Sequence, residues 1–416
     1  MLKAIKIRLY PSQDKTIYIN KLLGTSRFIY NQCLNYKITE YESTKKSTNL
    51  GETGKFLTSL KSSNEWIKES HSKVLQQQLI NLERAYKNFF KNGSGFPKFK
   101  SKHDNNQSCR FPVDAISGIN GNRINIINAL KDIHFKCSVK DEKYLNKNQS
   151  QIKSGTLSKT KSGNYYFSIL IDRPNKVIEK PKNELIGLDL GIKDFIITSE
   201  GQTYENLKSK RNNQVKLSRL QRQVSKKQKG SKNKEKARLR LAKTYNKLNN
   251  IKEYYLHSIT NQLLSENQTI VIEDLNVSGM LKNHKLAKSI QELSLNRFKT
   301  MLMYKAEWYG REVIQVSRWF PSSKLCNCCG YKKNDLVLKD RTWLCPECNT
   351  SHDRDINAAI NIKNEGYKIK IGLSSPESTH QESKTLVPHR MMKEIVKNNL
   401  IFTELYDILQ DNLIKN

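Results

Sequence analysis

The sequence ELIGLDLGIKDFIITSEG at residues 184–201 decides the fold of the second half of the chain. It contains two apolar runs with a tight turn between them, which predicts a β-hairpin that begins a new domain. Asp189 lies inside the first of these strands. A charged side chain within an apolar strand is costly unless it has a partner. Asp189 is therefore a candidate for a functional role.

Strands and helices are also expected downstream of the hairpin. NQTIVIEDL at residues 267–275 and REVIQVS at 311–317 have the apolar composition of strands. We expect one helix near residues 289–309 and a short one from Asp355 to about Lys363. Acidic residues thus stand at the ends of several predicted elements, where functional side chains of α/β domains gather.

A strongly basic segment separates the hairpin from these elements. Residues 208–252 contain seventeen Lys or Arg residues and an apolar stripe that is broken at 229–231. The pattern predicts two long basic helices that form a helical hairpin. Such a run is often only a solvated helical face, but this many positive charges repel one another unless a polyanion neutralises them.

The first half of the chain predicts a strand, then helices, then short strands. LKAIKIRLY at residues 2–10 alternates in strand fashion and stops at Pro11. Helical spacing follows from Asp14 to Tyr36 and again over residues 72–90. Turn-rich short segments over residues 111–172 are typical of a small β barrel or sandwich.

The length and the net charge of the chain limit the classes of function that it can have. The chain has 416 residues, enough for two or three domains, and a formal net charge of +34 from 73 Lys and Arg against 39 Asp and Glu. This excess favours nucleic acid as partner. An anionic membrane is the rival, but no apolar run approaches the roughly 18 residues of a spanning helix. The alternating N-terminus predicts a strand and no signal peptide.

Cysteine spacing predicts one structural zinc ion. Four of the eight cysteines form two CxxC pairs with fifteen residues between the inner two, and the others are scattered, which fits a reducing cytoplasm. Four thiolates close a tetrahedral shell and leave no position for water, so this zinc should fold the segment and take no part in catalysis. Cys328 could replace one ligand, but the glycine that follows Cys329 suits the knuckle turn. The expected ligands are Cys326, Cys329, Cys345 and Cys348.

Acidic residues on three separate segments could hold divalent metal ions. Hydrolysis of a phosphodiester by two metals needs carboxylates that converge from different elements. Each residue has an ordinary alternative role, as a turn acid, a strand-end acid or a helix N-cap. Spacing alone leaves open which member of each neighbouring pair is used. The candidates are Asp189, Glu273 or Asp274, and Asp353 or Asp355.

Taken in order, these segments resemble the TnpB family, the OrfB proteins of insertion sequences. The resemblance is carried by KAIKIRLYPSQDK, LERAYKNFFKNGSGFPKFK, GLDLGIKDF, LQRQVSKKQKGSKNKEKARLRLAK, IEDL, WFPSSKLCNCCG and WLCPECNTSHDRDINAAINI. It covers nearly the whole chain up to about Gly366. The family is thought to be ancestral to type V CRISPR effectors.

The resemblance implies an α+β multidomain fold. Residues 1–10 and 96–180 would form a wedge-like β barrel, with a helical recognition lobe inserted at 11–95. Residues 185–320 and 351–366 would form a RuvC-like nuclease domain with a ribonuclease H fold, including the basic helical hairpin at 208–252. A zinc ribbon at 321–350 would interrupt this domain, and 367–416 would be a C-terminal tail of uncertain order.

The resemblance also assigns residues and an activity. The family's three acids fall on Asp189, Glu273 and Asp355, which leaves Asp353 as the weaker choice. Family members are RNA-guided DNA endonucleases, so a transposon-derived guide RNA, double-stranded target DNA next to a short flanking motif, and two Mg²⁺ ions are expected. Lys73 and Gln77 match a stretch that contacts the flanking duplex. Guide RNA or heteroduplex phosphates are expected to contact Arg219, Arg222, Lys226, Lys227, Lys229 and Lys232.

Two rival hypotheses remain. The chain could be a non-cutting guided regulator, although acids fill all three positions. It could also be a transposase or a transposition accessory protein that joins DNA ends, since such enzymes use similar carboxylates. A zinc ribbon inside the nuclease domain favours the guided nuclease.

Overall fold

The computed structural model describes residues 2–104, 107–174, 180–207, 212–284, 286–337 and 339–373. Within the described part of the chain, no helix is both long enough and apolar enough to cross a membrane. Of the predicted basic hairpin, residues 208–211 lie outside the described residues, as do residues 374–416 of the predicted tail.

The first half contains a seven-stranded sheet with one apolar core. The N-terminal strand β1 (Leu2–Tyr10) confirms the alternating pattern and lies between two strands from much later in the chain, both antiparallel to it. Ile5, Ile7 and Leu9 point into the core. The strand order is β2-β6-β7-β1-β5-β4-β3. The other strands are β2 (Gln107–Pro112), β3 (Gly118–Asn120), β4 (Arg123–Asn125), β5 (Ile133–Lys136), β6 (Ile152–Lys159) and β7 (Tyr165–Asp172), with the short helix α5 (Val139–Lys147).

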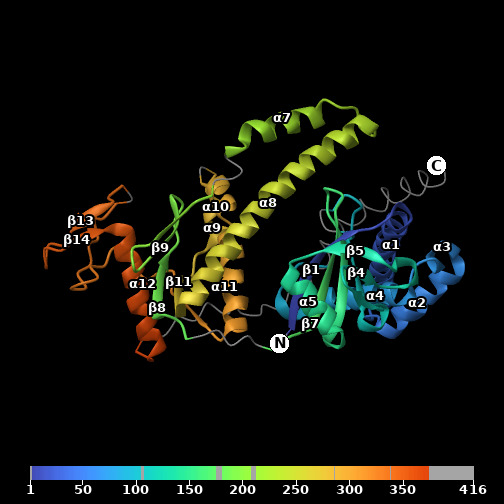
Figure 1. The fold of residues 1–416 in the computed structure, drawn as a ribbon, viewed down its shortest axis with the longest axis horizontal. Helices are drawn as coiled ribbons and strands as arrows, with labels where there is room; N and C mark the ends of the chain where they lie inside the picture. The colour runs from blue at the N-terminus through green and yellow to red at the C-terminus, as the bar shows by residue number, and fades with distance from the viewer. Residues whose placement is uncertain are drawn as a thin grey trace. The chain divides into compact units, whose positions relative to one another are not determined.

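Four helices follow β1 in the chain. The first extends to Thr44, beyond the predicted end at Tyr36, and the fourth ends before Gly93, which adopts a left-handed conformation. Ile19 and Val74 from these two helices enter the core of the sheet, so helices and sheet pack as one body. The helices, coloured blue in Figure 1, are α1 (Gln13–Thr44), α2 (Leu50–Ser63), α3 (Glu65–Lys68) and α4 (Ser72–Asn92).

The second half is built on a five-stranded sheet of order β10-β9-β8-β11-β12. The predicted hairpin at 184–201 is confirmed, because its two strands pair antiparallel with Asp189 opposite Ile197. The central strand pairs parallel with β11, which pairs parallel with β12. The strands are β8 (Asn183–Asp189), β9 (Asp194–Thr198), β10 (Thr203–Glu205), β11 (Asn267–Glu273) and β12 (Glu312–Val316).

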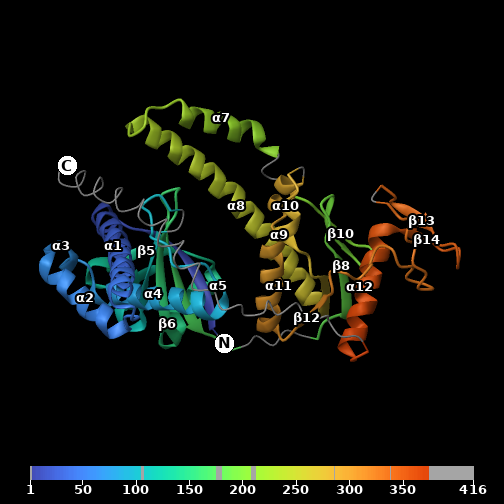
Figure 2. The same cartoon turned by 180° about the vertical axis from the view of Figure 1, so that it is seen from behind.

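Helices cover both faces of this sheet. One apolar core joins it to α8 (Lys232–Glu266) and α11 (Leu295–Tyr309), and a second joins the opposite face to α12 (Arg354–Lys370). Both views show α12 on one side of the strands and α11 on the other (Figures 1 and 2). The C-terminal helix runs seven residues beyond its predicted end at Lys363, and Lys370 forms an ion pair with Glu184 at the start of β8.

Two predictions about helices need correction. The expected single helix at 289–309 is two helices, α10 (Ala287–Leu293) and α11, because Ser294 between them has a left-handed backbone with φ of 57°. The basic hairpin consists of α7 (Gln214–Ser225) and α8, but α8 continues to Glu266. The two pack together, and Gln221 donates to the hydroxyl of Tyr245 at 2.9 Å.

Candidate active site and metal centre

Two of the predicted acids end neighbouring parallel strands. Asp189 is the last residue of β8 and Glu273 the last of β11, and the register pairs the preceding residues Leu188 and Ile272. The two carboxylates therefore leave the sheet side by side at its carboxyl edge, where α/β proteins place their sites. Asp189 had been expected inside its strand and instead lies at its end.

The electrostatics show that a third acid is close. Burial, together with the negative charges of Glu273 and Asp355, raises the pKa of Asp189 to about 7. Burial also raises the pKa of Glu273, against a hydrogen bond from Ser322 that lowers it. Three carboxyl groups from separate elements thus share one environment, which disfavours their simultaneous ionisation unless cations are present.

The structure distinguishes Glu273 from its neighbour. Asp274 forms ion pairs with Lys299 and Arg318 on the following elements. Its pKa is lowered because these hydrogen bonds outweigh the effect of burial. Asp274 is therefore occupied as a structural ion-pair partner, whereas Glu273 lies toward the other acids.

Asp353 and Asp355 also differ in their contacts. Asp353 is the N-cap of α12, and its carboxylate accepts from the backbone N–H groups of Asp355 and Ile356 at 3.0 Å. Asp355 lies in the first turn and forms an ion pair with Arg341 at 3.1 Å. The N-cap hydrogen bonds account for the carboxylate of Asp353. Asp355, in contrast, is the acid whose negative charge raises the pKa of Asp189.

The three carboxylates are not drawn into one tight cluster. Among the described residues, the four cysteines are the one group of three or more metal-ligating side chains whose ligand atoms all lie within 4.8 Å of one another. Arg341 occupies the oxygens of Asp355. A pair of metal ions about 4 Å apart spans a wider set of ligands than a single ion does, so the chemistry of the three acids fits such a pair.

The cysteine cluster has the form of a zinc ribbon. Sγ atoms of Cys326 and Cys348 are 3.6 Å apart, as are those of Cys329 and Cys345. Tetrahedral thiolate ligands at about 2.3 Å from zinc would be separated by about 3.8 Å. Cys328 lies outside the cluster and contacts Asn327.

Local backbone geometry shapes the two knuckles alike. The residue after each CxxC pair has positive φ, 79° at Gly330 and 54° at Asn349, and its N–H donates to the carbonyl of the first cysteine. Strands β13 (Thr342–Leu344) and β14 (Ser351–Asp353) pair on either side of the second knuckle, and β14 leads into α12. His352, which no motif in the sequence marks as a candidate, places its Nε2 3.1 Å from Cys326 Sγ.

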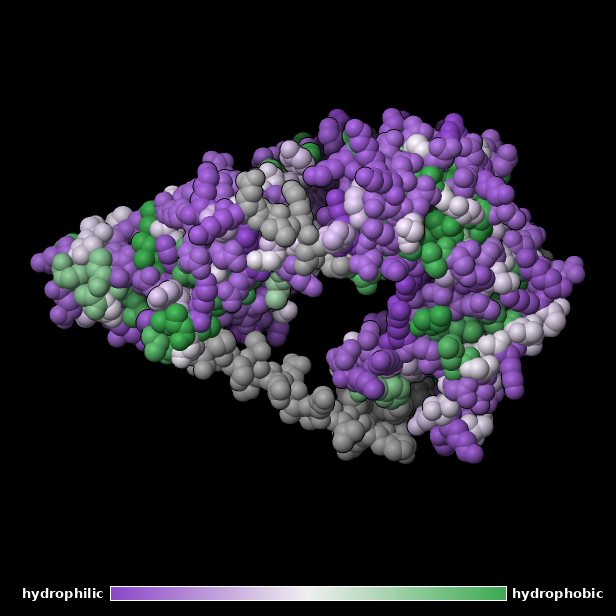
Figure 3. Space-filling view, turned by 60° about the horizontal axis from the view of Figure 1, so that its bottom comes forward, coloured by the Kyte–Doolittle hydropathy of each residue, from purple (hydrophilic) through white to green (hydrophobic). Residues whose placement is uncertain are grey.

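The residues predicted to contact nucleic acid are at the surface. The six basic residues chosen on the helical hairpin are all exposed. Figure 3 shows hydrophilic residues over most of one face of the molecule, with hydrophobic residues in separate patches. Lys73 is exposed and forms an ion pair with Asp114, so binding a phosphate would require this pair to open, and Gln77 is half-buried one turn along α4.

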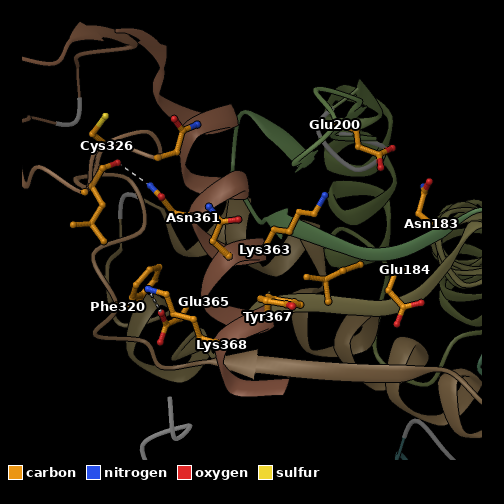
Figure 4. A pocket seen from close by; sticks show the side chains of 15 residues that line it. Asn183, Glu184, Glu200, Phe320, Cys326, Asn361, Lys363, Glu365, Tyr367 and Lys368 are labelled. Atoms are coloured by element: carbon orange, nitrogen blue, oxygen red, sulfur yellow. Dashed lines mark hydrogen bonds and ion pairs between the residues drawn. The ribbon is translucent and has the colours of Figure 1, made fainter. Parts of the chain in front are cut away.

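The structure also contains a pocket of about 730 Å³. It is bordered by later turns of α12, the start of β8 and the chain that leads into the ribbon (Figure 4). Asn361, Lys363 and Tyr367 line it, and none of the three carboxylates does. The three candidate acids therefore lie outside this pocket.

The chain is similar to several known proteins. Three family models match: a helix-turn-helix domain at residues 1–46, a probable transposase at 168–284, and a Cas12f1-like TNB domain at 296–362. A protein of Streptomyces pristinaespiralis, whose name describes an RNA-guided DNA endonuclease, is 33% identical over 86% of this chain and 88% of its own length. The chain belongs to the TnpB family. A relative from Escherichia coli K12 with a name of the same kind is 30% identical over 88% of this chain and 93% of its own length.

A solved structure shows the same fold at greater distance. The Cas12f1 chain in a cryo-EM complex with single-guide RNA and target DNA has a TM-score of 0.56 and 15% identity, and covers 88% of this chain and 99% of that one. This TnpB family member thus shares its fold with a type V effector over 88% of the chain.

Two polar residues at the acids were not found from the sequence. Ser322 donates to Glu273 and Arg341 pairs with Asp355, and both belong to the segment predicted as the ribbon. The serine lies within WFPSSKLCNCCG, a motif that carries the TnpB resemblance. Its motif position was the available signal, but nothing in the spacing indicates which acid a ribbon residue reaches.

Proposed function

We propose that this protein is an RNA-guided DNA endonuclease encoded by a transposable element, which hydrolyses target DNA beside a short flanking motif. The observation that carries the proposal is the convergence of Asp189, Glu273 and Asp355 at the carboxyl edge of one sheet. The negative charges of the other two acids both raise the pKa of Asp189. The names of the relatives and the Cas12f1 complex support guide RNA and target DNA as partners.

The strand order supports a RuvC-like nuclease domain with a ribonuclease H fold. Three strands of an antiparallel meander are followed by two parallel strands joined through helices. We assign this domain to residues 185–320 and 351–366, interrupted by a zinc ribbon at 321–350. The seven-stranded sheet at 1–10 and 96–180 would be the wedge-like barrel, and the helices at 11–95 the recognition lobe.

The three acids would bind two Mg²⁺ ions. When bound, such ions activate a water molecule and stabilise the departing oxygen of the phosphodiester. The negative charges of both other acids raise the pKa of Asp189, so this carboxylate would hold metal ions together with each of them. To bind metal together with the other two acids, Asp355 would have to break its ion pair with Arg341. The guanidinium of Arg341 would then be available to contact a phosphate.

The basic helical hairpin would hold the guide RNA, derived from the transposon, or its heteroduplex with target DNA. In guided recognition, base pairing selects the sequence and the protein binds the A-form backbone through positive charge. The exposed cations of α7 and α8 supply that charge. Lys73 and Gln77 remain candidates for contact with the flanking duplex.

One experiment tests the activity. The chain is co-expressed with the DNA that surrounds its gene, purified with its bound RNA, and incubated with a target library and Mg²⁺ beside Asp189→Ala. We expect cutting that depends on guide and metal and is lost in the variant. Lys193→Ala, an exposed neighbour of the same hairpin, serves as the matched control.

The rival hypotheses predict other products. Bound RNA and guided DNA binding without cutting in either protein would contradict the nuclease and establish a regulator. Joined DNA ends would instead establish a transposase.

A further inference from the structure

Ser322 makes a direct contact with one of the three acids. It lies between β12 and the first zinc-ribbon cysteine, is 8% exposed, and donates its hydroxyl to Oε1 of Glu273 at 2.5 Å. Hydrogen bonds to a charged acceptor are short and about twice as strong as neutral ones. The contact restricts how the Glu273 carboxylate can rotate.

The backbone around Ser322 is itself held by two buried asparagines of α12. Asn361 donates through Nδ2 to the carbonyls of Ser322 at 2.8 Å and Leu325 at 2.7 Å, and Figure 4 shows it directed toward the chain beside Cys326. Asn357, one turn earlier, donates to the carbonyl of Leu325 at 2.7 Å and accepts from the N–H of Asn327 at 3.1 Å.

These amides are costly to bury and are well satisfied. Asn357 is 1% exposed and Asn361 is 6% exposed, so each would destabilise the fold if its partners moved. The segment 322–327 is therefore fixed against α12. If this network served only to attach the ribbon, the Ser322 hydroxyl could bond to any local carbonyl, yet it is directed at Glu273.

We propose that Ser322 is a positioning residue for Glu273, locked in place by Asn357 and Asn361. The proposal rests on the proposed function only in that Glu273 is taken as a metal ligand. The helix that carries Asp355 in its first turn then also fixes the second acid, through Ser322. The single helix α12 thus determines the positions of two of the three carboxylates, those of Asp355 and Glu273.

The test compares Ser322→Ala, Ser322→Thr and Lys333→Met. Threonine keeps the hydroxyl, and Lys333 forms an exposed ion pair with Asp335 in the ribbon, which is not one of the three candidate acids. Binding of Mn²⁺ alone is measured by electron paramagnetic resonance on the zinc-loaded protein. The Mg²⁺ concentration that gives half-maximal guided cleavage is measured in parallel, with zinc content and circular dichroism as checks of folding.

We expect Ser322→Ala to weaken Mn²⁺ binding by about 10- to 100-fold and to raise the Mg²⁺ midpoint similarly, as loss of a partner behind a metal ligand does. Threonine should restore most of the affinity, and Lys333→Met should match the wild type. Wild-type Mn²⁺ affinity in Ser322→Ala would overturn the proposal.

Equal losses in the alanine and threonine variants, with folding intact, would also overturn it, because side-chain volume and not the hydroxyl would then matter. If the wild type binds Mn²⁺ and shows the serine dependence but cuts no guided target, the positioning role is supported and the proposed function fails. The two hypotheses are thereby tested separately.

Discussion

Replacement of Gly187 by alanine should displace α12 from the sheet and reduce cleavage at the candidate active site. Gly187 lies in β8 two residues before Asp189, at the point where α12 crosses. A Cβ atom there would lie 2.2 Å from the carbonyl oxygen of Ala359, 2.6 Å from the backbone nitrogen of Lys363 and 2.8 Å from its Cβ. Two of these are backbone atoms of a helix, which cannot rotate away.

The size of the effect follows from these distances. Non-bonded atoms pack best at about 3.5 Å, so α12 must withdraw by roughly 1 Å. Overpacking of a core costs about 1–3 kcal/mol. In a domain of about 200 residues, this lowers Tm by roughly 2–12 °C. Because α12 carries Asp355 and the strand carries Asp189, a shift near 1 Å should also reduce cleavage by about 100-fold.

Thermal unfolding and single-turnover guided cleavage of Gly187→Ala would measure both effects. The matched control is Gly24→Ala in α1, where an added Cβ has no atom within 4 Å and the gain in helix propensity is up to about 1 kcal/mol. If Gly187→Ala has the Tm and the cleavage rate of the wild type, the close packing of α12 on β8 does not determine the positions of the acids, and this reasoning is refuted.

Three further predictions concern Lys305, a buried lysine of α11, the zinc ribbon and the basic helical hairpin. Burial lowers the pKa of Lys305 from 10.5 to about 8, so between these pH values the unfolded chain keeps a proton that the folded one has lost. Between pH 7.5 and 10.5 the free energy of unfolding of the wild type should therefore rise by up to about 3 kcal/mol relative to that of Lys305→Met. Denaturant unfolding at both pH values measures this difference, and the same difference at both pH values would contradict the prediction. Cys329→Ser should release zinc and destabilise the ribbon while Cys328→Ser keeps one ion per chain, as measured by metal analysis after chelation; equal zinc contents would exclude the assigned ligand set. Doubly replacing Lys226 and Lys227 with glutamine should weaken guide RNA binding and flatten the slope of log affinity against log salt by about 1.4 to 1.8; an unchanged slope would place the RNA elsewhere.

Local pattern predicted the elements but not the pairings between distant segments. Alternation in residues 2–10 indicated a strand, yet its position between β7 and β5 depends on partners more than 120 residues away. The hairpin at 184–201 was predictable because strands and turn lie in one short segment. The break at Ser294 was not, since the apolar spacing continues across a residue whose hydroxyl accepts from Lys252 of another helix.

The site shows the same division between local and tertiary information. Spacing identified three acidic segments and both CxxC pairs, but each neighbouring pair of acids looks alike in sequence. Asp274 is distinguished from Glu273 only by Lys299 and Arg318, which fold onto it from later elements. The family resemblance makes the same choice as these contacts, because it carries tertiary information that one chain's spacing does not contain.

The position of the zinc ribbon follows from the topology of the sheet. Strand β12 ends at Val316, level with Glu273, and α12 begins at the same edge and runs back along the sheet to Glu184. The chain therefore leaves and re-enters at nearly one place, where an insertion adds little loop-closure entropy. The same edge holds the acids, so an inserted unit there is within reach of them. Ser322 and Arg341 are the contacts that result, and a ribbon folded by zinc would hold them more rigidly than a loop of equal length.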